Sequence, residues 1–134
     1  MAQEVLALLD LNGSERILDV GCGDGRITAE IASRAPRGSV VGVDPSRDMI
    51  RFAQSHYDSS ARPNLRFQVA DARSLPFQNE FDLVVSFNAL HWVPEQEAAL
   101  SSIHSSLISG GKAQLRLVPA CTRKSLEKIV EETR

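Results

Sequence analysis

The sequence predicts an α/β domain in which a mainly parallel sheet lies between two layers of helices. Short apolar segments alternate with stretches of helical periodicity along most of the 134 residues. No tight hairpin joins neighbouring strands, and a glycine-rich turn follows the first buried strand. Strands that alternate with helices in this way need crossover connections, which produce parallel sheets with both faces covered.

The first strand and the turn after it are the feature around which the chain is organised. Residues 17–20 are apolar apart from one aspartate and predict a short buried strand. Gly21, Gly23 and Gly25 follow, and a helical pattern then runs to about Arg34. Glycine permits positive φ and close approach of a ligand to the backbone, while the helix start offers unpaired N–H groups. We therefore expect a ligand-binding turn; the alternative is a tight turn without a ligand.

The remaining elements follow in order from apolar periodicity and from turn residues. Pro45 fits the first turn of a helix, and Gly110-Gly111 fits the end of one. In the helix after Pro94, the inward positions are Ala98, Leu100, Ile103 and Leu107. The predicted elements are a helix over 2–9, strands over 39–44, 65–69, 81–87 and 112–118, and helices over 45–56, 94–109 and 125–132.

Composition limits the class of protein. A chain of 134 residues with 43% hydrophobic residues predicts one domain with a real core, spanning residues 1–134. The net charge of -2 argues against nucleic-acid binding through bulk electrostatics, although basic residues late in the chain leave a local basic face open. Cys22 and Cys121 have no metal-ligand spacing, so no metal is expected. With no membrane-length apolar run and no signal-like start, we expect a soluble cytoplasmic protein.

Polar side chains stand at the ends of four predicted strands. In open α/β sheets, ligands bind outside the carboxyl ends of the strands, near the point where strand order reverses. Because these ends meet at one edge, we expect the four side chains to line a single site. They are Asp19, Asp44, Asp71 and Asn88.

The spacing of the glycines indicates which ligand this edge fits. A dinucleotide fold has the spacing G-x-G-x-x-G, with the pyrophosphate on the helix N-terminus. Here the spacing is G-x-G-x-G, and the acids Asp19 and Asp24 would repel a pyrophosphate. Asp44 suits a ribose hydroxyl in either case, whereas Asp71 is not part of the dinucleotide pattern. A nicotinamide-dependent oxidoreductase is therefore the less favoured alternative.

Four short motifs occur in order along the chain: Asp19-Val20-Gly21-Cys22-Gly23-Asp24-Gly25, Val43-Asp44, Ala70-Asp71-Ala72 and Phe81-Asp82-Leu83-Val84. Together they resemble the successive motifs of the class I S-adenosylmethionine-dependent methyltransferases. The segment from Ser86 to Val93 resembles the branch around trans-aconitate methyltransferase. The resemblance covers residues 3 to about 118 and implies a Rossmann-like three-layer αβα sandwich.

The resemblance also implies a cofactor, S-adenosyl-L-methionine, with S-adenosyl-L-homocysteine as the product. Its ammonium group would lie near Gly21, favoured electrostatically by Asp19, with the glycine loop under the methionine and ribose. Asp44 would accept both ribose hydroxyls, and Asp71 would accept from the adenine amino group; the alternative is that both acids cap the turns that follow their strands. The residues implied in cofactor binding are Asp19, Gly21, Gly23, Gly25, Asp44, Pro45, Met49, Asp71, Ala72 and Asn88.

His91 is the one candidate for a catalytic residue. Methyl transfer from a sulfonium is an in-line displacement that depends on alignment and a dry site, so a carboxylate acceptor needs no base. A phenol or an amine would need proton removal, and His91 follows the fourth strand with Trp92 as an apolar wall. The alternative is that both side chains pack against the following helix.

The chain departs from the family in its length. The family's sheet has seven strands, the last two forming an antiparallel edge, whereas this chain ends soon after the fifth. We therefore expect a fragment that binds the cofactor weakly, turns over poorly and self-associates through an exposed sheet edge. The predicted function is methyl transfer to a small-molecule acceptor; the branch resemblance alone implies carboxyl O-methylation, and C-methylation of a quinone-like ring stays open. A non-catalytic cofactor-binding or scaffold module is the alternative.

Overall fold

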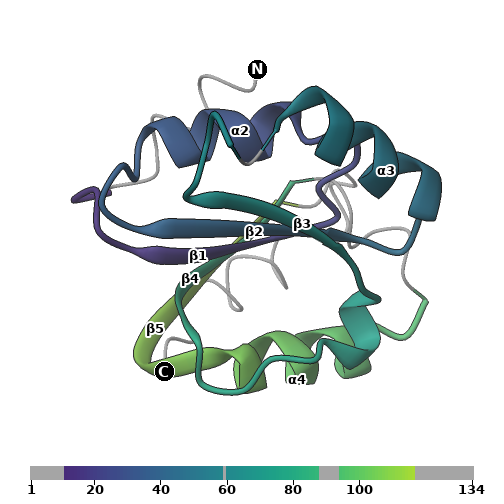
Figure 1. The fold of residues 1–134 in the computed structure, drawn as a ribbon. Coiled ribbons are helices and arrows are strands. Elements are labelled where there is room, and N and C mark those ends of the chain that lie inside the picture. Colours follow the sequence, from purple (N-terminus) through teal and green to yellow (C-terminus); the bar gives the residue numbers. More distant parts are fainter. Residues whose placement is uncertain (1–10, 59, 88–93, 117–134) are drawn as a thin grey trace.

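The computed structural model describes residues 11–58, 60–87 and 94–116, and it contains the predicted α/β sandwich (Figure 1). Five strands form one sheet in the order β3-β2-β1-β4-β5, and all four neighbouring pairs are parallel. The strands are β1 (Arg16–Val20), β2 (Ser39–Asp44), β3 (Leu65–Val69), β4 (Phe81–Phe87) and β5 (Leu107–Arg116). The helices are α2 (Arg26–Ser33), α3 (Arg47–His56), the 3₁₀ turn η1 (Ala72–Ser74) and α4 (Gln96–Ser106).

Helices cover both faces of the sheet, as the alternating pattern predicts. Figure 1 shows α2 and α3 on one face and α4 on the other. Alternate strand residues point to opposite faces, so Ile17 and Val40 belong to the core under α2 and α3. Leu18 and Val41 belong to the second core, together with Ile103 of α4. The sheet is therefore buried on both sides, which explains the nearly continuous apolar runs of β1, β2 and β4.

The order of the strands reverses at β1, which lies between β2 and β4. Its pairing with β2 continues to Val20↔Val43, but its pairing with β4 ends one residue earlier, at Asp19↔Val85. The carbonyl of Val20 instead accepts the buried hydroxyl of Ser86 over 2.9 Å. β1 and β4 thus separate at their carboxyl ends, where open α/β sheets bind ligands.

The boundary between α4 and β5 differs from the prediction. The helix ends at Ser106, and Leu107 begins β5 opposite Phe81. Gly110 and Gly111, expected to end the helix, lie inside β5, where its register with β4 shifts between Phe81 and Leu83. Gly110 has a φ of 87° there, so the glycine pair accommodates an irregular strand. Pairing with β4 outweighs the local helical signal at these positions.

Two smaller corrections concern the starts and faces of helices. Pro45 precedes the helix, because α3 begins at Arg47 and the Ser46 side chain accepts the backbone N–H of Met49 over 3.2 Å. Ala98 is exposed, whereas the neighbouring Ala99 is buried. The predicted helices over 2–9 and 125–132, and the last two residues predicted for the fifth strand, lie outside the described residues.

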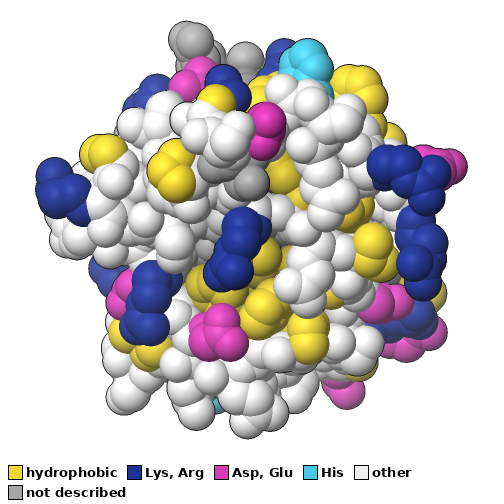
Figure 2. Space-filling model, viewed as in Figure 1, with side chains coloured by type: hydrophobic (Ala, Val, Ile, Leu, Met, Phe, Trp, Pro, Cys, Tyr) yellow, Lys and Arg dark blue, Asp and Glu magenta, His cyan; other side chains and the backbone are white. Residues whose placement is uncertain are grey.

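The surface of the described part of the chain mixes charge types. On the face viewed in Figure 2, the Lys and Arg side chains lie in several separate groups, with acidic side chains among them. The exposed large hydrophobic side chains are Met49, Phe52 and Val69, which lie on α3 and β3 rather than near β5. No helix among the described residues is both long enough and apolar enough to cross a membrane.

Candidate functional site

The glycine loop over 21–25 connects β1 to α2 in a conformation that requires glycine. Its three glycines have φ values of 77°, 56° and 85°, all in the left-handed region. The backbone N–H groups of Gly21 and Cys22 both donate to the carbonyl of Val43, over 2.8 and 2.9 Å. The N–H of Gly25 donates back to the carbonyl of Cys22 over 3.0 Å. The loop is therefore closed on itself and fastened to the end of β2.

The glycines at 23 and 25 serve different purposes. A Cβ on Gly25 would lie 2.7 Å from the ring of Phe67, so close packing of the loop on β3 and α3 excludes a side chain. A Cβ on Gly23 would meet only the Cε of Met49, at 3.8 Å. Gly25 is thus required by the core, whereas the open side of the loop is at Gly23, next to Met49.

Asp44 joins the glycine loop to the start of α3. Its Oδ2 accepts the backbone N–H of Gly23 over 3.0 Å, and its Oδ1 accepts the N–H of Ser46 over 2.9 Å. A carboxylate offers about four acceptor positions, two on each oxygen. Among the described residues, these two bonds leave one position free on each oxygen of Asp44. The side chain is half-buried and is held in place by backbone groups alone.

Asp19 lies beneath the loop with its side chain fully buried. Only 2% of the residue is exposed, and its Oδ2 accepts the hydroxyl of Thr28 over 2.7 Å. Burial raises the pKa of Asp19 to about 7; the Thr28 hydrogen bond lowers it, and the charge of Asp44 raises it. Because its carboxylate is covered by protein, Asp19 is placed to influence its surroundings through its charge rather than through direct contact with solvent.

Asp24 occupies the start of α2. Its Oδ1 accepts the backbone N–H of Arg26 over 3.0 Å, and the side chain is exposed. A phosphate bound at a helix N-terminus uses these same N–H groups. The carboxylate of Asp24 therefore takes a donor that a pyrophosphate would need and adds negative charge beside it.

Asp71 extends the site along the carboxyl edge to β3. The N–H of Ala70 donates to the carbonyl of Asp44 over 3.1 Å, and Asp71 lies two residues after the end of β3. Asp71 caps η1, whose buried Ala72 packs into the core. The guanidinium of Arg73 contacts both oxygens of Asp71, and these hydrogen bonds lower the pKa of the carboxyl.

Cys22 carries a thiol, which acts as a nucleophile only when it is ionised. Its surroundings in the structure oppose that ionisation. The residue is 8% exposed, and burial raises the pKa of its thiol well above the ordinary value, with Asp19 adding to the effect. A buried neutral thiol is a packing group. Among the described residues, no group of three His, Cys, Asp or Glu side chains is placed to hold a metal ion.

The structure brings most of the predicted binding residues to one edge. Gly23 is hydrogen-bonded to Asp44, Met49 faces Gly23, and Pro45 is exposed beside Asp44. Asn88 and the catalytic candidate His91, with its neighbour Trp92, lie outside the described residues.

Sequence reasoning missed the contacts of two side chains with the acids, Thr28 with Asp19 and Arg73 with Asp71, and the capping of α3 by Ser46. Ser46 carries a recognisable signal, because serine just before a helix is a preferred cap. Thr28 and Arg73 carry none, since periodicity does not show which polar side chains meet an acid across a turn.

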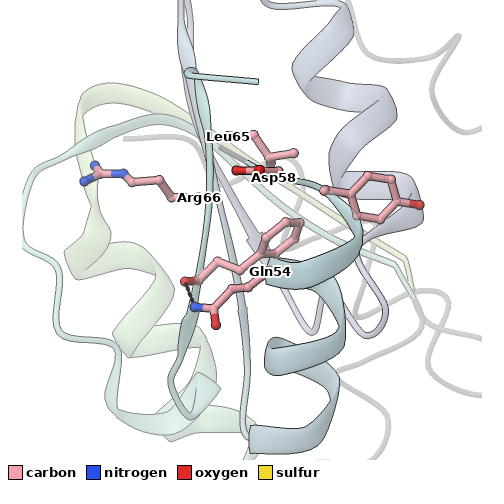
Figure 3. A pocket seen from close by; sticks show the side chains of 6 residues that line it. Gln54, Asp58, Leu65 and Arg66 are labelled. Carbon is pink, nitrogen blue, oxygen red and sulfur yellow. Dashed lines mark hydrogen bonds between the residues drawn. The ribbon is translucent and has the colours of Figure 1, made fainter. Parts of the chain in front are cut away.

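The hollow of Figure 3 is separate from this edge. It lies beside β3 and the end of α3, has a volume of about 360 Å³, and includes the 3.1 Å hydrogen bond from the Gln54 side chain to the carbonyl of Phe67. None of the predicted binding residues lines it. Its lining residues are Gln54, Tyr57, Asp58, Leu65, Arg66 and Phe67.

Comparison with known proteins agrees with the geometry of the carboxyl edge. A family model described as a methyltransferase domain matches residues 17–111, which include all the described site residues above. A trans-aconitate 2-methyltransferase of Deinococcus radiodurans is 34% identical over 119 residues, covering 89% of this chain and 43% of that protein. A juvenile hormone acid O-methyltransferase of Drosophila melanogaster is 38% identical over 102 residues, covering 72% of this chain and 34% of that protein.

A solved structure of the cyclase SpnF matches with a TM-score of 0.77 at 28% identity, covering 85% of this chain and 42% of that one. The chain spans less than half the length of each of these three proteins.

Proposed function

The chain belongs to the class I S-adenosylmethionine-dependent methyltransferases, and from this premise we propose that it binds S-adenosylmethionine and transfers its methyl group to a small carboxylic acid. The cofactor would lie along the carboxyl ends of β1, β2 and β3. Asp44 carries the proposal, because two backbone N–H groups hold its carboxylate and leave one acceptor position on each oxygen. Two neighbouring ribose hydroxyls supply two donors, which match those positions.

The charge along the edge fits the methionine end of the cofactor better than a pyrophosphate. Asp19 lies under the loop, Asp44 lies beside it, and Asp24 accepts the backbone N–H of Arg26 at the start of α2. A buried carboxylate attracts an ammonium group strongly when little water lies between them. An ammonium near Gly21 would in turn favour the ionised form of Asp19. The same charges oppose a nicotinamide dinucleotide.

The adenine would lie between Met49 and the segment that starts at Asp71. Met49 is 37% exposed and faces the open side of the glycine loop, so its side chain offers an apolar surface to a flat ring. Asp71 would accept from the adenine amino group, and the backbone N–H of Ala72 would face the ring.

The chemistry follows from holding two reactants in line. When bound, S-adenosylmethionine supplies a methyl group on a positively charged sulfur. The chain's part is to bind and orient that group and to exclude water, and alignment alone supplies several kcal/mol in such reactions. A carboxylate acceptor needs no base, so His91 would border the acceptor and take a proton only from a phenol or an amine.

The proposed acceptor class is supported by the names of the relatives. Trans-aconitate 2-methyltransferase and juvenile hormone acid O-methyltransferase are both named for acids. The SpnF structure is named as a cyclase, so a likeness in fold does not by itself establish methyl transfer.

Two measurements test the proposal. Calorimetric titration with S-adenosylhomocysteine and with NAD should show binding of the first and none of the second; the reverse would establish the oxidoreductase alternative. Methyl incorporation from labelled cofactor into a panel of small carboxylic acids, carried out with a full-length form, should label at least one acid. Binding of S-adenosylhomocysteine without transfer to any acid, phenol or amine would establish the non-catalytic alternative.

A further inference from the structure

Arg73 holds the carboxylate of Asp71 on two sides. Its Nε and its backbone N–H both donate to Oδ1, over 3.0 and 2.9 Å, and its Nη2 donates to Oδ2 over 2.7 Å. Arg73 lies only two residues after Asp71, so η1 folds the guanidinium back onto the acid that caps it. A planar guanidinium that binds both oxygens fixes the plane of the carboxylate as well as its position.

These bonds determine what the carboxylate can still accept. Of about four acceptor positions on a carboxylate, the bonds to Arg73 use both positions on Oδ1 and one on Oδ2. One position on Oδ2 remains among the described residues. The side chain of Asp71 is 36% exposed, so a ligand can reach it. Asp71 is thereby suited to a single N–H donor, whereas Asp44 is suited to two hydroxyls.

The same guanidinium reaches the start of α4. Its Nη1 donates to Oε2 of Glu95 over 3.0 Å, immediately before α4 begins. A second contact follows along the segment, because the N–H of Leu75 donates to the hydroxyl of Ser102 over 2.7 Å. The turn that carries Asp71 is therefore fastened to α4 at two points.

We propose that Arg73 is a positioning residue of the cofactor site, which orients Asp71 so that its one remaining acceptor position, on Oδ2, meets the adenine amino group. This inference rests on the proposed function. Arg73 itself contacts no part of the cofactor and acts through Asp71, with Glu95 holding the other side of its guanidinium.

A double-mutant cycle in the intact chain tests whether Arg73 acts through Asp71. Calorimetry measures S-adenosylhomocysteine affinity for the wild type, Arg73→Met, Asp71→Ala and the double variant. Loss of one well-placed hydrogen bond corresponds to a roughly three- to tenfold weaker affinity. We expect that loss for Arg73→Met alone and no further loss when it is added to Asp71→Ala.

Arg16→Met is the matched control. Arg16, the first residue of β1, forms an exposed ion pair with Asp82 over 3.4 Å at the opposite end of the strands, so the Arg16→Met variant should bind S-adenosylhomocysteine like the wild type. Thermal unfolding checks folding, and because exposed ion pairs add little stability, both arginine variants should melt within a few degrees of the wild type. Arg73→Lys keeps the charge but lacks the planar guanidinium that binds both oxygens of Asp71. Its affinity for S-adenosylhomocysteine should fall between those of the wild type and Arg73→Met.

Each other result counts against the proposal. An equal loss on Arg73→Met with and without Asp71 would show that Arg73 acts independently, and a gain in affinity would show that it competes with the ligand for Asp71. Either result would leave the proposed function standing if the wild type binds S-adenosylhomocysteine. Absence of binding by the wild type would overturn both the proposed function and this inference.

Discussion

The backbone N–H of Gly23 donates to Oδ2 of Asp44 over 3.0 Å, so one carboxylate links the loop after β1 to the end of β2. The two residues are 21 positions apart in the chain. The contact fixes the loop and leaves the carboxylate with acceptor positions for a ligand. In the described part of the chain, one side chain thus both fastens the loop and keeps acceptor positions open.

Replacing Asp44 should weaken cofactor binding more than it weakens the fold. Asp44→Ala removes an acceptor for ligand hydroxyls, and hydrogen bonds to charged groups contribute roughly 1.5–3 kcal/mol each. We expect S-adenosylhomocysteine affinity, measured by calorimetry, to fall by at least the contribution of one such bond. Asp48→Ala, which removes a carboxylate from the exposed first turn of α3, is the control and should bind normally. Equal affinities for Asp44→Ala and the wild type would contradict the assigned role.

Replacing Gly23 or Gly25 by alanine should show which of the two glycines is required by close packing. Gly25→Ala adds a Cβ 2.7 Å from Phe67 at a φ of +85°, so unfolding in urea should show a loss of roughly 2–4 kcal/mol. Gly23→Ala has room at 3.8 Å from Met49, and its positive φ should cost about 1–2 kcal/mol. The prediction fails if Gly23→Ala is the less stable of the two.

The free energy of unfolding should depend on pH through Asp19. Burial raises its pKa from 3.8 to about 7, so the folded state binds a proton more tightly than the unfolded state does. The stabilisation is fully present below pH 3.8 and is lost as the pH rises through about 7. One pKa unit corresponds to about 1.4 kcal/mol, so the loss amounts to a few kcal/mol. Asp19→Asn should remove this component from urea unfolding curves recorded between pH 5 and pH 8; an unchanged difference between these pH values would exclude Asp19 as its source.

Cofactor affinity should also change with pH in the same range. If an ammonium group binds over the loop, it favours ionised Asp19, so binding below about pH 7 releases a proton. S-adenosylhomocysteine should therefore bind more tightly at pH 8 than at pH 6, and calorimetry in buffers of different ionisation enthalpy should detect the released proton. Asp19→Asn should show neither effect. A wild-type affinity that does not change between pH 6 and pH 8 would show that Asp19 does not interact with the ammonium group.

The sequence predicted strands best where both faces of the sheet are buried. The predicted bounds of β2, β3 and β4 agree with the structure, because apolar runs between turn residues leave few alternatives. The predicted end of α4 was wrong. Leu107 continues the helical spacing, and Gly110 and Gly111 come soon after it, so the sequence favoured a longer helix. Only the pairing of Leu107 with Phe81 decides that boundary, and such long-range pairing is not visible in local periodicity.

The candidate site was predictable to the level of the acids and the glycines. Strand ends and glycine spacing identify Asp44 and the loop, because both follow from the topology of a parallel sheet. The pairing of Asp19 with Thr28, and of Asp71 with Arg73, depends on side-chain directions in the folded chain. These contacts set the ionisation of the acids and the acceptor positions that stay free on them, so neither property could be predicted from the sequence.

The early separation of β1 from β4 bears on how such a protein can be re-engineered. In the described part of the chain, the glycine loop is anchored to Val43 and Asp44 of β2, while the β1–β4 ladder stops at Asp19↔Val85. Substitutions in β4 beyond Val85 would therefore leave in place the hydrogen bonds from the glycine loop to Val43 and Asp44.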